Sequence, residues 1–182
     1  MPQEARLVPT EGGLVPEGEG WFVVNAREAR WWKHPDFGWA TTFENEEEAR
    51  FKEFGINIQV LTPGEPNCMY HAENGQEDFL VLYGECLLIV EGEERRLGQW
   101  DFVHCPPWTK HVFVGAGNGP CAILMVGLRP EDEELLYPVD GAALKHNAGV
   151  GEETTSGREA YARFGKSQVE PMPEGTLPSF SP

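Results

Sequence analysis

The chain has 182 residues, enough for one domain with extensions and for a hydrophobic core that needs neither disulfides nor a structural metal. It carries 30 acidic side chains against 14 basic ones, a formal net charge of −16. A field of that sign repels a phosphate backbone and an anionic membrane surface, so neither nucleic acid nor a membrane is an expected partner.

The sequence also indicates a compartment. No basic start leads into an apolar run near Met1, and no stretch approaches the ~18 consecutive apolar residues of a membrane span, so we expect no signal peptide and no transmembrane helix. The four cysteines, Cys68, Cys86, Cys105 and Cys121, form no C-x-x-C pair. We therefore expect a soluble, cytoplasmic protein whose thiols are reduced and mostly buried.

Residues 1–55 are expected to form an N-terminal arm and a cover segment. Residues 1–20 are rich in Gly, Pro and Glu and predict an extended arm. A short strand is expected at 21–24. Short helices are expected at 25–32 and 45–52, each begun by an asparagine that could cap it.

This N-terminal third is dense in aromatic residues, namely Trp21, Trp31, Trp32, Phe37 and Trp39. Aromatic side chains at that density are usually packed against something. They could form a lid over the end of the barrel expected next, or a surface exchanged between two subunits. No feature of the sequence separates these two interpretations.

From residue 56 to residue 128 the chain changes to short apolar runs divided by turn signals. The expected strands cover 57–62, 78–83, 86–90, 93–97, 100–105, 111–114 and 121–128. Strands at this even spacing predict an all-β sandwich or barrel, with a tight hairpin at Val90–Glu93.

Residues 129–182 are expected to form a C-terminal extension. Short helices are expected at 131–136 and 157–164, and the proline-rich tail from residue 171 onward predicts no ordered core element.

A cluster of metal-ligating residue types precedes and follows the central strands. His71 and Glu73 are two apart and would share one face of a strand, while Glu77 opens the next strand. His111 follows a Pro-Pro turn, at the start of a later strand. Taken singly, each could be a core histidine or a solvated acid. Together, two histidines and a carboxylate on one face form the arrangement associated with non-haem iron.

Other residues near this cluster are weaker candidates. Tyr70 could carry a proton, or it could be a strand residue that faces away. His104 is expected to be structural, because nothing pairs it with the cluster. Phe79, Val81 and Phe113 could line an apolar pocket for a small organic ligand, or belong to an ordinary barrel core.

The combination resembles the two motifs of the cupin family. The first motif reads G-x5-H-x-H-x3-4-E-x6-G: His71 falls at its first His, Glu77 and Gly84 fit its second half, and Glu73 stands where the second His is expected. Gly64 lies one residue too far upstream of His71 to match the first Gly of this motif. The second motif is matched by Gly98, Asp101, Pro106, Pro107 and His111, while Gly115 replaces the usual Asn. The resemblance implies an all-β double-stranded β-helix, a jelly-roll barrel with the metal inside and with short terminal helices and extended arms around it.

The departure at Glu73 makes the site similar to that of ring-cleaving cupin dioxygenases, such as 3-hydroxyanthranilate and homogentisate dioxygenases. The resemblance implies that His71, Glu77 and His111 are the metal ligands, with Glu73 as a bystander or a fourth ligand. The substrate-binding arginines of that family would fall at Asn67 and Gly115, which cannot replace a guanidinium. We therefore expect this chain to share the metal-binding scaffold of these dioxygenases but not their substrate.

Three hypotheses for the function follow. The first is a mononuclear iron(II) dioxygenase, an oxidoreductase that acts on a catechol, an aminophenol or another small aromatic or oxygenated molecule. The second is a metal-dependent isomerase or lyase that uses Zn2+, Mn2+ or Ni2+, with Glu73 or Tyr70 as proton carrier. The third is a non-catalytic cupin that binds a metal or a ligand. Fe2+ is the favoured metal, a small molecule is the expected ligand, and a homodimer is the expected assembly.

Overall fold

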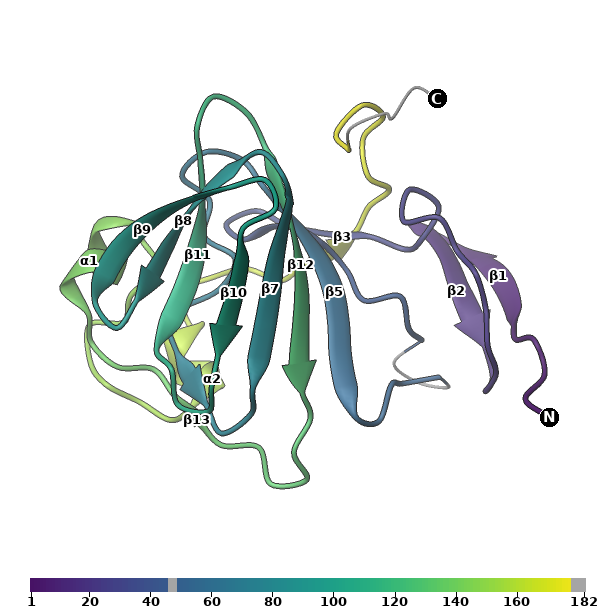
Figure 1. Cartoon of the computed structure of the whole chain (residues 1–182), viewed down its shortest axis with the longest axis horizontal. Helices are drawn as coiled ribbons and strands as arrows, with labels where there is room; N and C mark the ends of the chain where they lie inside the picture. Colours follow the sequence, from purple (N-terminus) through teal and green to yellow (C-terminus); the bar gives the residue numbers. More distant parts are fainter. Residues whose placement is uncertain (46–48, 178–182) are drawn as a thin grey trace.

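The computed structural model describes residues 1–45 and 49–177. Within these residues the chain is almost entirely β, with strands β1 to β14 and two short helices, α1 (Gly141–Lys145) and α2 (Gly157–Ala160). The central strands form a barrel; the helices lie on one side of it and the N-terminal hairpin on the other (Figure 1). This architecture confirms the expected all-β jelly roll.

The larger sheet has seven strands in the order β10-β7-β12-β5-β4-β3-β14. Its strands are β3 (Trp32–His34), β4 (Gly38–Thr41), β5 (Phe54–Leu61), β7 (Glu77–Tyr83), β10 (Phe102–Cys105), β12 (Cys121–Leu128) and β14 (Gln168–Val169). Strands β5, β7, β10 and β12 lie where the apolar runs predicted strands. The flanking segments add β3, β4 and β14, so the sheet extends beyond the predicted barrel core.

The smaller sheet has the order β11-β8-β9, formed by β11 (His111–Ala116), β8 (Glu85–Val90) and β9 (Glu93–Gly98). The predicted hairpin joins β8 to β9, with positive φ at both central residues, 48° at Glu91 and 79° at Gly92. This is the turn whose twist suits two-residue hairpins. Two short pairs complete the fold: β1 (Arg6–Thr10) with β2 (Gly13–Glu17), and β6 (Ala72–Glu73) with β13 (Leu135–Leu136).

Alternation along the strands places the core between the two sheets. Side chains two apart share a face, so Phe79 and Val81 point inward while Leu82 points outward. The inner cluster consists of Leu61, Phe79, Val81, Cys86, Leu88, Cys105, Phe113, Cys121, Ile123 and Met125. Three of the four free thiols, at positions 86, 105 and 121, are buried here, and the fourth, at 68, is partly buried.

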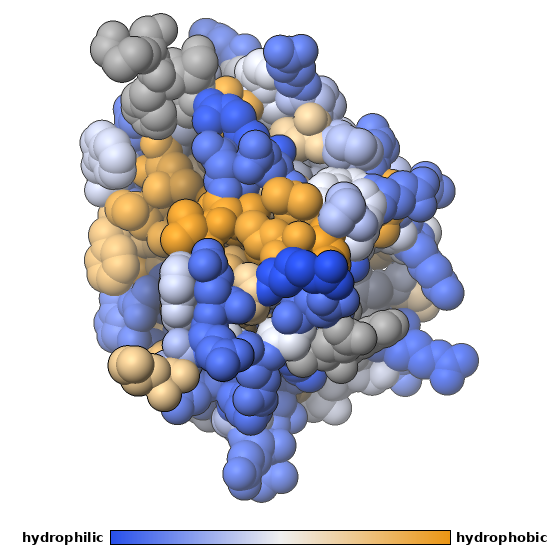
Figure 2. Space-filling model, turned by 90° about the vertical axis from the view of Figure 1, so that its right-hand side faces the viewer, coloured by the Kyte–Doolittle hydropathy of each residue, from blue (hydrophilic) through white to orange (hydrophobic). Residues whose placement is uncertain are grey.

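The N-terminal aromatic residues mostly pack within the chain. Trp31 and Trp39 are buried against Ile58 and Val60 on the outer face of the larger sheet. Figure 2 views the side of the molecule on which the β1–β2 hairpin lies, and a hydrophobic band crosses its mostly hydrophilic surface. The cover segment therefore lies mainly over a sheet face.

The short helices predicted in the N-terminal third are wrong where the structure describes them. Residues 26–28 form a turn in which Asn25 Oδ1 accepts the Arg27 N–H at 3.0 Å, and β3 begins at Trp32. For the second helix, residues 46–48 lie outside the described residues, and 49–52 are not helical. The physical reason is tertiary: β3 pairs with β4 and β14, and these contacts outweigh local propensity.

The C-terminal extension differs from its prediction in detail. A strand, β13, occupies the last two residues of the helix expected at 131–136, because Leu135 and Leu136 pair with β6. Helix α2 begins at the predicted residue, after the N-cap Ser156, but ends at Ala160. Helix α1, capped by Asp140, was not predicted. Among the described residues no helix has the length and apolar character that crossing a membrane requires.

Candidate metal centre

The structure brings His71, Glu77 and His111 together. His71 and His111 face each other in an isolated antiparallel bridge: the His111 N–H donates to the His71 carbonyl at 2.8 Å, and the reverse bond measures 3.2 Å. Glu77 is the first residue of β7. One potential ligand atom from each of the three residues lies within 4.8 Å of the others.

Backbone carbonyls determine which ring nitrogen of each histidine carries the proton. His71 Nδ1 lies 2.9 Å from the carbonyl oxygen of Met69, and His111 Nδ1 lies 2.9 Å from that of Thr109. A carbonyl can only accept, so Nδ1 must be the donor in both rings. The lone pair of each neutral imidazole is then on Nε2, as metal-ligating histidines require.

Both Nε2 atoms are directed toward Glu77. The Glu77 Oε2 atom lies 3.2 Å from His111 Nε2 and 3.9 Å from His71 Nε2. His111 Nε2 is buried and, among the residues that the structure describes, lacks a partner with hydrogen-bond geometry despite the short distance. Two nitrogen lone pairs and a carboxylate that converge in this way repel one another unless a cation lies among them. The residues therefore fit a divalent metal ion.

The pKa shifts of the three groups show that Glu77 stabilises a positive charge beside it, whether a protonated histidine or a bound cation carries that charge. Burial, and after it the neighbouring His111, lower the pKa of His71 to about 4. Burial also acts to lower the pKa of His111, but the Glu77 carboxylate outweighs it and the net shift is upward. Burial alone would raise the pKa of Glu77, yet the two histidines hold it below its ordinary value. Glu77 is therefore an ionised carboxylate that favours a positive charge beside it.

Glu73 lies beside this trio but outside it. Its Oε1 atom and that of Glu77 lie 3.9 and 3.8 Å from the position that a Cβ at Gly127 would occupy, so both carboxylates border the same glycine. Burial and the charges of Glu77 and Glu133 raise the pKa of Glu73 to about 7. Glu73 is thus close to the metal position without joining the set of convergent ligands.

Tyr70, the other residue expected to take part in catalysis, lies on the opposite face. It packs with Ile89, Val112 and Val114, whose side chains alternate with those of His111 and Phe113. Its hydroxyl accepts the Gly92 N–H at 3.0 Å. The structure does not bring Tyr70 to the three converging residues.

The remaining histidines are also elsewhere. His104 lies 2.7 Å from Asp78 Oδ1, His146 lies 3.1 Å from Glu94 Oε1, and His34 lies 3.1 Å from the Gly165 carbonyl.

Aromatic side chains surround the trio. The ring of Phe79 lies 5.1 Å from that of His111, and the ring of Phe113 lies 4.7 Å from that of Phe79. Tyr137, which the sequence analysis missed, is buried with its ring 6.0 Å from His71. It belongs to the C-terminal extension and is brought there by the β13–β6 pair. Because Tyr137 is far from His71 along the chain, no feature of the sequence indicates that the two rings are neighbours.

The two positions where the family arginines would fall are closed. Asn67 is buried, and its Oδ1 accepts the Phe113 N–H at 2.8 Å. At Gly115 an added Cβ would lie 2.1 Å from the Thr62 carbonyl oxygen, so no side chain fits there.

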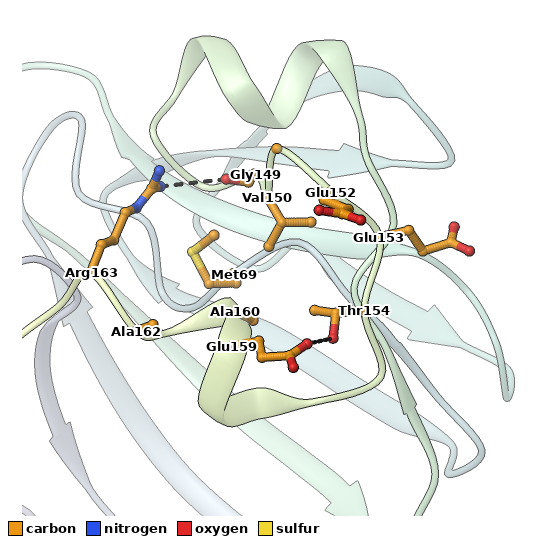
Figure 3. Close-up of a pocket in the computed structure, with 11 residues that line it drawn as sticks. Met69, Gly149, Val150, Glu152, Glu153, Thr154, Glu159, Ala160, Ala162 and Arg163 are labelled. Carbon is orange, nitrogen blue, oxygen red and sulfur yellow. Dashed lines mark hydrogen bonds between the residues drawn. The ribbon is translucent and has the colours of Figure 1, made fainter.

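A pocket of about 520 Å³ lies in the C-terminal extension, between the 149–154 segment and α2 (Figure 3). Its lining includes Met69, Val150 and Ala160, with Glu152 and Arg163 at the edge. None of the three converging residues lines it. It shares with the metal centre only Met69, whose carbonyl accepts from His71.

The comparisons with known proteins agree with the fold. Residues 57–127 match the Cupin_2 family, described as a cupin domain. No curated protein matches the chain.

Three similar solved structures have a TM-score of 0.51. A sugar phosphate isomerase of the cupin superfamily from Silicibacter pomeroyi is 22% identical, over 59% of this chain and 73% of its own. The polyketide cyclase RemF from Streptomyces resistomycificus is 15% identical, over 61% and 82%. A predicted oxalate decarboxylase from Thermotoga maritima is 18% identical, over 59% and 99%.

At these identities the structural likeness establishes the fold alone. The Cupin_2 match over residues 57–127 supports a place for the barrel in the cupin superfamily. The converging histidines and glutamate give this barrel a candidate divalent metal site.

Proposed function

We propose that His71, Glu77 and His111 hold one divalent metal ion, and that the protein is a mononuclear iron(II) dioxygenase for a small aromatic or oxygenated organic molecule. The observation that carries the proposal is the convergence of two Nε2 lone pairs and one carboxylate, with each Nδ1 bound to a carbonyl two residues earlier. Two histidines and one carboxylate with open coordination positions are typical of non-haem iron oxygenases.

Iron(II), when bound, would supply the open positions and the electron transfer that oxygen chemistry needs. The protein groups supply orientation and proton handling. Glu77 fixes the charge of the site, while the Met69 and Thr109 carbonyls hold the two imidazoles in place. Glu73, beside Glu77, is positioned to accept a proton from a substrate hydroxyl, and Phe79 excludes water from the buried side.

A metal-dependent isomerase or lyase is the second candidate. One observation favours it: the Glu73 carboxyl borders the same glycine as Glu77 without joining the convergent trio, so it is free to carry protons beside the ion. In that reaction the ion would act as a Lewis acid and oxygen would not be consumed.

Oxygen uptake by the reconstituted protein separates these candidates. Protein loaded anaerobically with Fe2+ is mixed with catechol or 2-aminophenol in an oxygen electrode, beside the same protein loaded with Zn2+. We expect uptake only with iron, reduced at least about tenfold in Glu73→Gln, the effect typical of losing a general base. Stoichiometric iron without oxygen uptake from a wider set of phenols would contradict the dioxygenase and leave the isomerase or a non-catalytic binder.

A further inference from the structure

Two polar side chains point into the barrel from β5, where an apolar core would be expected. Leu61 belongs to the inner core cluster, and Gln59 and Asn57 are two and four residues before it, so they share its face. Their partners across the sheet confirm this: Gln59 lies opposite Ile123 and Asn57 opposite Met125, both members of the inner cluster.

The amide oxygens of these side chains find no donor among residues 1–45 and 49–177. Within that part of the chain, Asn57 Oδ1 and Gln59 Oε1 are both buried atoms without a hydrogen-bond partner. A buried acceptor left unpaired lowers stability, so native structures rarely keep one without a reason. Here two occur on one face of one strand, and both residues are only partly buried although they face inward.

The same face leads to the metal centre. Asn57 is separated from β7 by β12 alone, in the row Asn57, Met125, Phe79. Two strand spacings of about 4.8 Å place it about 10 Å from Phe79, a span that a small organic molecule covers. In the neighbouring row, Gly127 lies between Glu77 and Gly55, so β12 itself projects no side chain beside the Glu77 carboxylate.

The negative charge of this region favours a ligand that donates hydrogen bonds over an anionic ligand. Glu73 contributes a further carboxylate, and the described groups that act electrostatically on it are Glu77, Glu133 and His111. Arg129 lies against Gly55, but both of its terminal nitrogens bind the Glu44 carboxylate, at 3.0 and 2.6 Å. An acceptor-only ligand would meet unpaired acceptors here, whereas a hydroxyl or amine would satisfy them.

We infer that Asn57 and Gln59 are specificity-determining residues of the metal centre, and that they select a substrate with a hydroxyl or amine donor, rather than an anionic group, at its end remote from the metal. This inference rests on the proposed metal centre and names the substrate class that it takes. The unpaired amide oxygens reflect a site arranged to bind that donor.

The test uses chelators that bind an open metal position regardless of the reaction catalysed. Zn2+-loaded protein is titrated by calorimetry with 3- and 4-hydroxybenzohydroxamate and with the matching methoxy compounds, which lack the donor. We expect at least one hydroxy compound to bind about tenfold more tightly than its methoxy partner, the value of one well-made hydrogen bond. The ratio should fall to near one in Gln59→Met or Asn57→Leu.

Thermal melting of the same variants provides the second measurement. If the amides serve a ligand, Gln59→Met should melt at or above the wild-type temperature, because an unpaired buried acceptor has been removed. The control Gln76→Met loses a bond of 2.6 Å to Asp78 and should leave the chelator ratio unchanged. Equal binding of hydroxy and methoxy compounds in wild type, or a lower melting temperature in both β5 variants, overturns the inference. Either outcome leaves the metal centre intact, whereas protein that takes up no Zn2+ contradicts the centre and the inference together.

Discussion

At the scale of single residues, the chemistry depends on how the backbone holds two imidazole rings. Residues 71 and 111 each bond through Nδ1 to the carbonyl two positions earlier, so the ring orientation is local and the convergence comes from strand pairing. Phe79 supports this geometry from inside the barrel, 2% exposed and in contact with the ring of His111.

Replacing Phe79 tests that support. Phe79→Ala removes a buried ring and should lower the free energy of unfolding by about 3–5 kcal/mol. Phe102→Ala, on the neighbouring strand but 65% exposed, is the matched control and should change it by less than about 1 kcal/mol. Urea unfolding measures both. Similar losses in the two variants would show that the aromatic contact is not a special support.

Sequence reasoning could find the candidate ligands because they lie close to turns and in register with apolar runs. It placed His71, Glu77 and His111 in one set by motif, and the structure brings them together. It could not find Tyr137, because a two-residue strand pair between distant segments places that ring. The signal for Asn57 and Gln59 was present as alternating polar positions in β5, but which face pointed inward was undetermined until the register was known.

At the scale of elements, the barrel depends on strands that approach too closely for side chains. Gly115 in β11 lies so close to the segment after β5 that an added Cβ would be 2.1 Å from the Thr62 carbonyl. The Gly115 N–H also donates to the Glu65 carbonyl, and its own carbonyl accepts from Gly64, both at 2.8 Å. This contact fixes the start of the segment that leads to His71.

Gly115→Ala should therefore destabilise the fold by about 2–3 kcal/mol or more, because backbone must move to admit the methyl group. Gly119→Ala is the control, since its added Cβ meets nothing within 4 Å. Thermal melting of both variants gives the comparison. A Gly115→Ala protein as stable as the control would mean that the two segments separate easily.

The contacts that form each element explain why the barrel strands could be predicted from the sequence and the terminal strands could not. The barrel strands follow from apolar runs bounded by turn signals, and their side chains pack where the alternation places them. The terminal elements follow from contacts between distant segments: β14 pairs with β3, and β13 with β6. Each strand of these pairs has two or three residues, too few for a periodic pattern to show.

At the scale of the whole molecule, a buried ion pair joins the cover segment to the barrel. Glu44 is 2% exposed and binds Arg129, which follows β12. Burial acts to raise the pKa of Glu44, but hydrogen bonds from Arg129 and the Phe51 N–H outweigh it and hold the pKa below 4.5. The ionised carboxylate is therefore the form that the folded protein binds.

This pair predicts a pH dependence of stability. Because the folded pKa of Glu44 is depressed, its contribution is present above pH 4.5 and is lost as the pH falls through the lower folded value. Glu44→Gln should lower stability at pH 7 by about 2 kcal/mol and by progressively less toward pH 3. Urea unfolding across that range measures it. Glu17→Gln, in an exposed pair with Arg6, should have little effect at any pH; an equal loss for both variants would contradict the account.

We further propose a homodimer that uses the side on which the β1–β2 hairpin lies. The hydrophobic band on that side supports the proposal, as does the exposure of Trp21 (52%) and Val23 (79%). Sedimentation at micromolar concentration should give twice the 20.3 kDa chain mass, and Val23→Glu should shift it toward one chain. A single-chain mass for the wild-type protein would contradict the dimer.

The most direct test of the central claim is the metal content of anaerobically purified protein, compared with His111→Ala and His104→Ala. Elemental analysis should give about one divalent ion per wild-type chain, preferably iron. It should give the same in His104→Ala, whose histidine pairs with Asp78, and little or none in His111→Ala. The melting curve of each variant confirms that it is folded. A folded wild-type protein that takes up no stoichiometric metal even after reconstitution, or an unchanged content in His111→Ala, would contradict the metal centre.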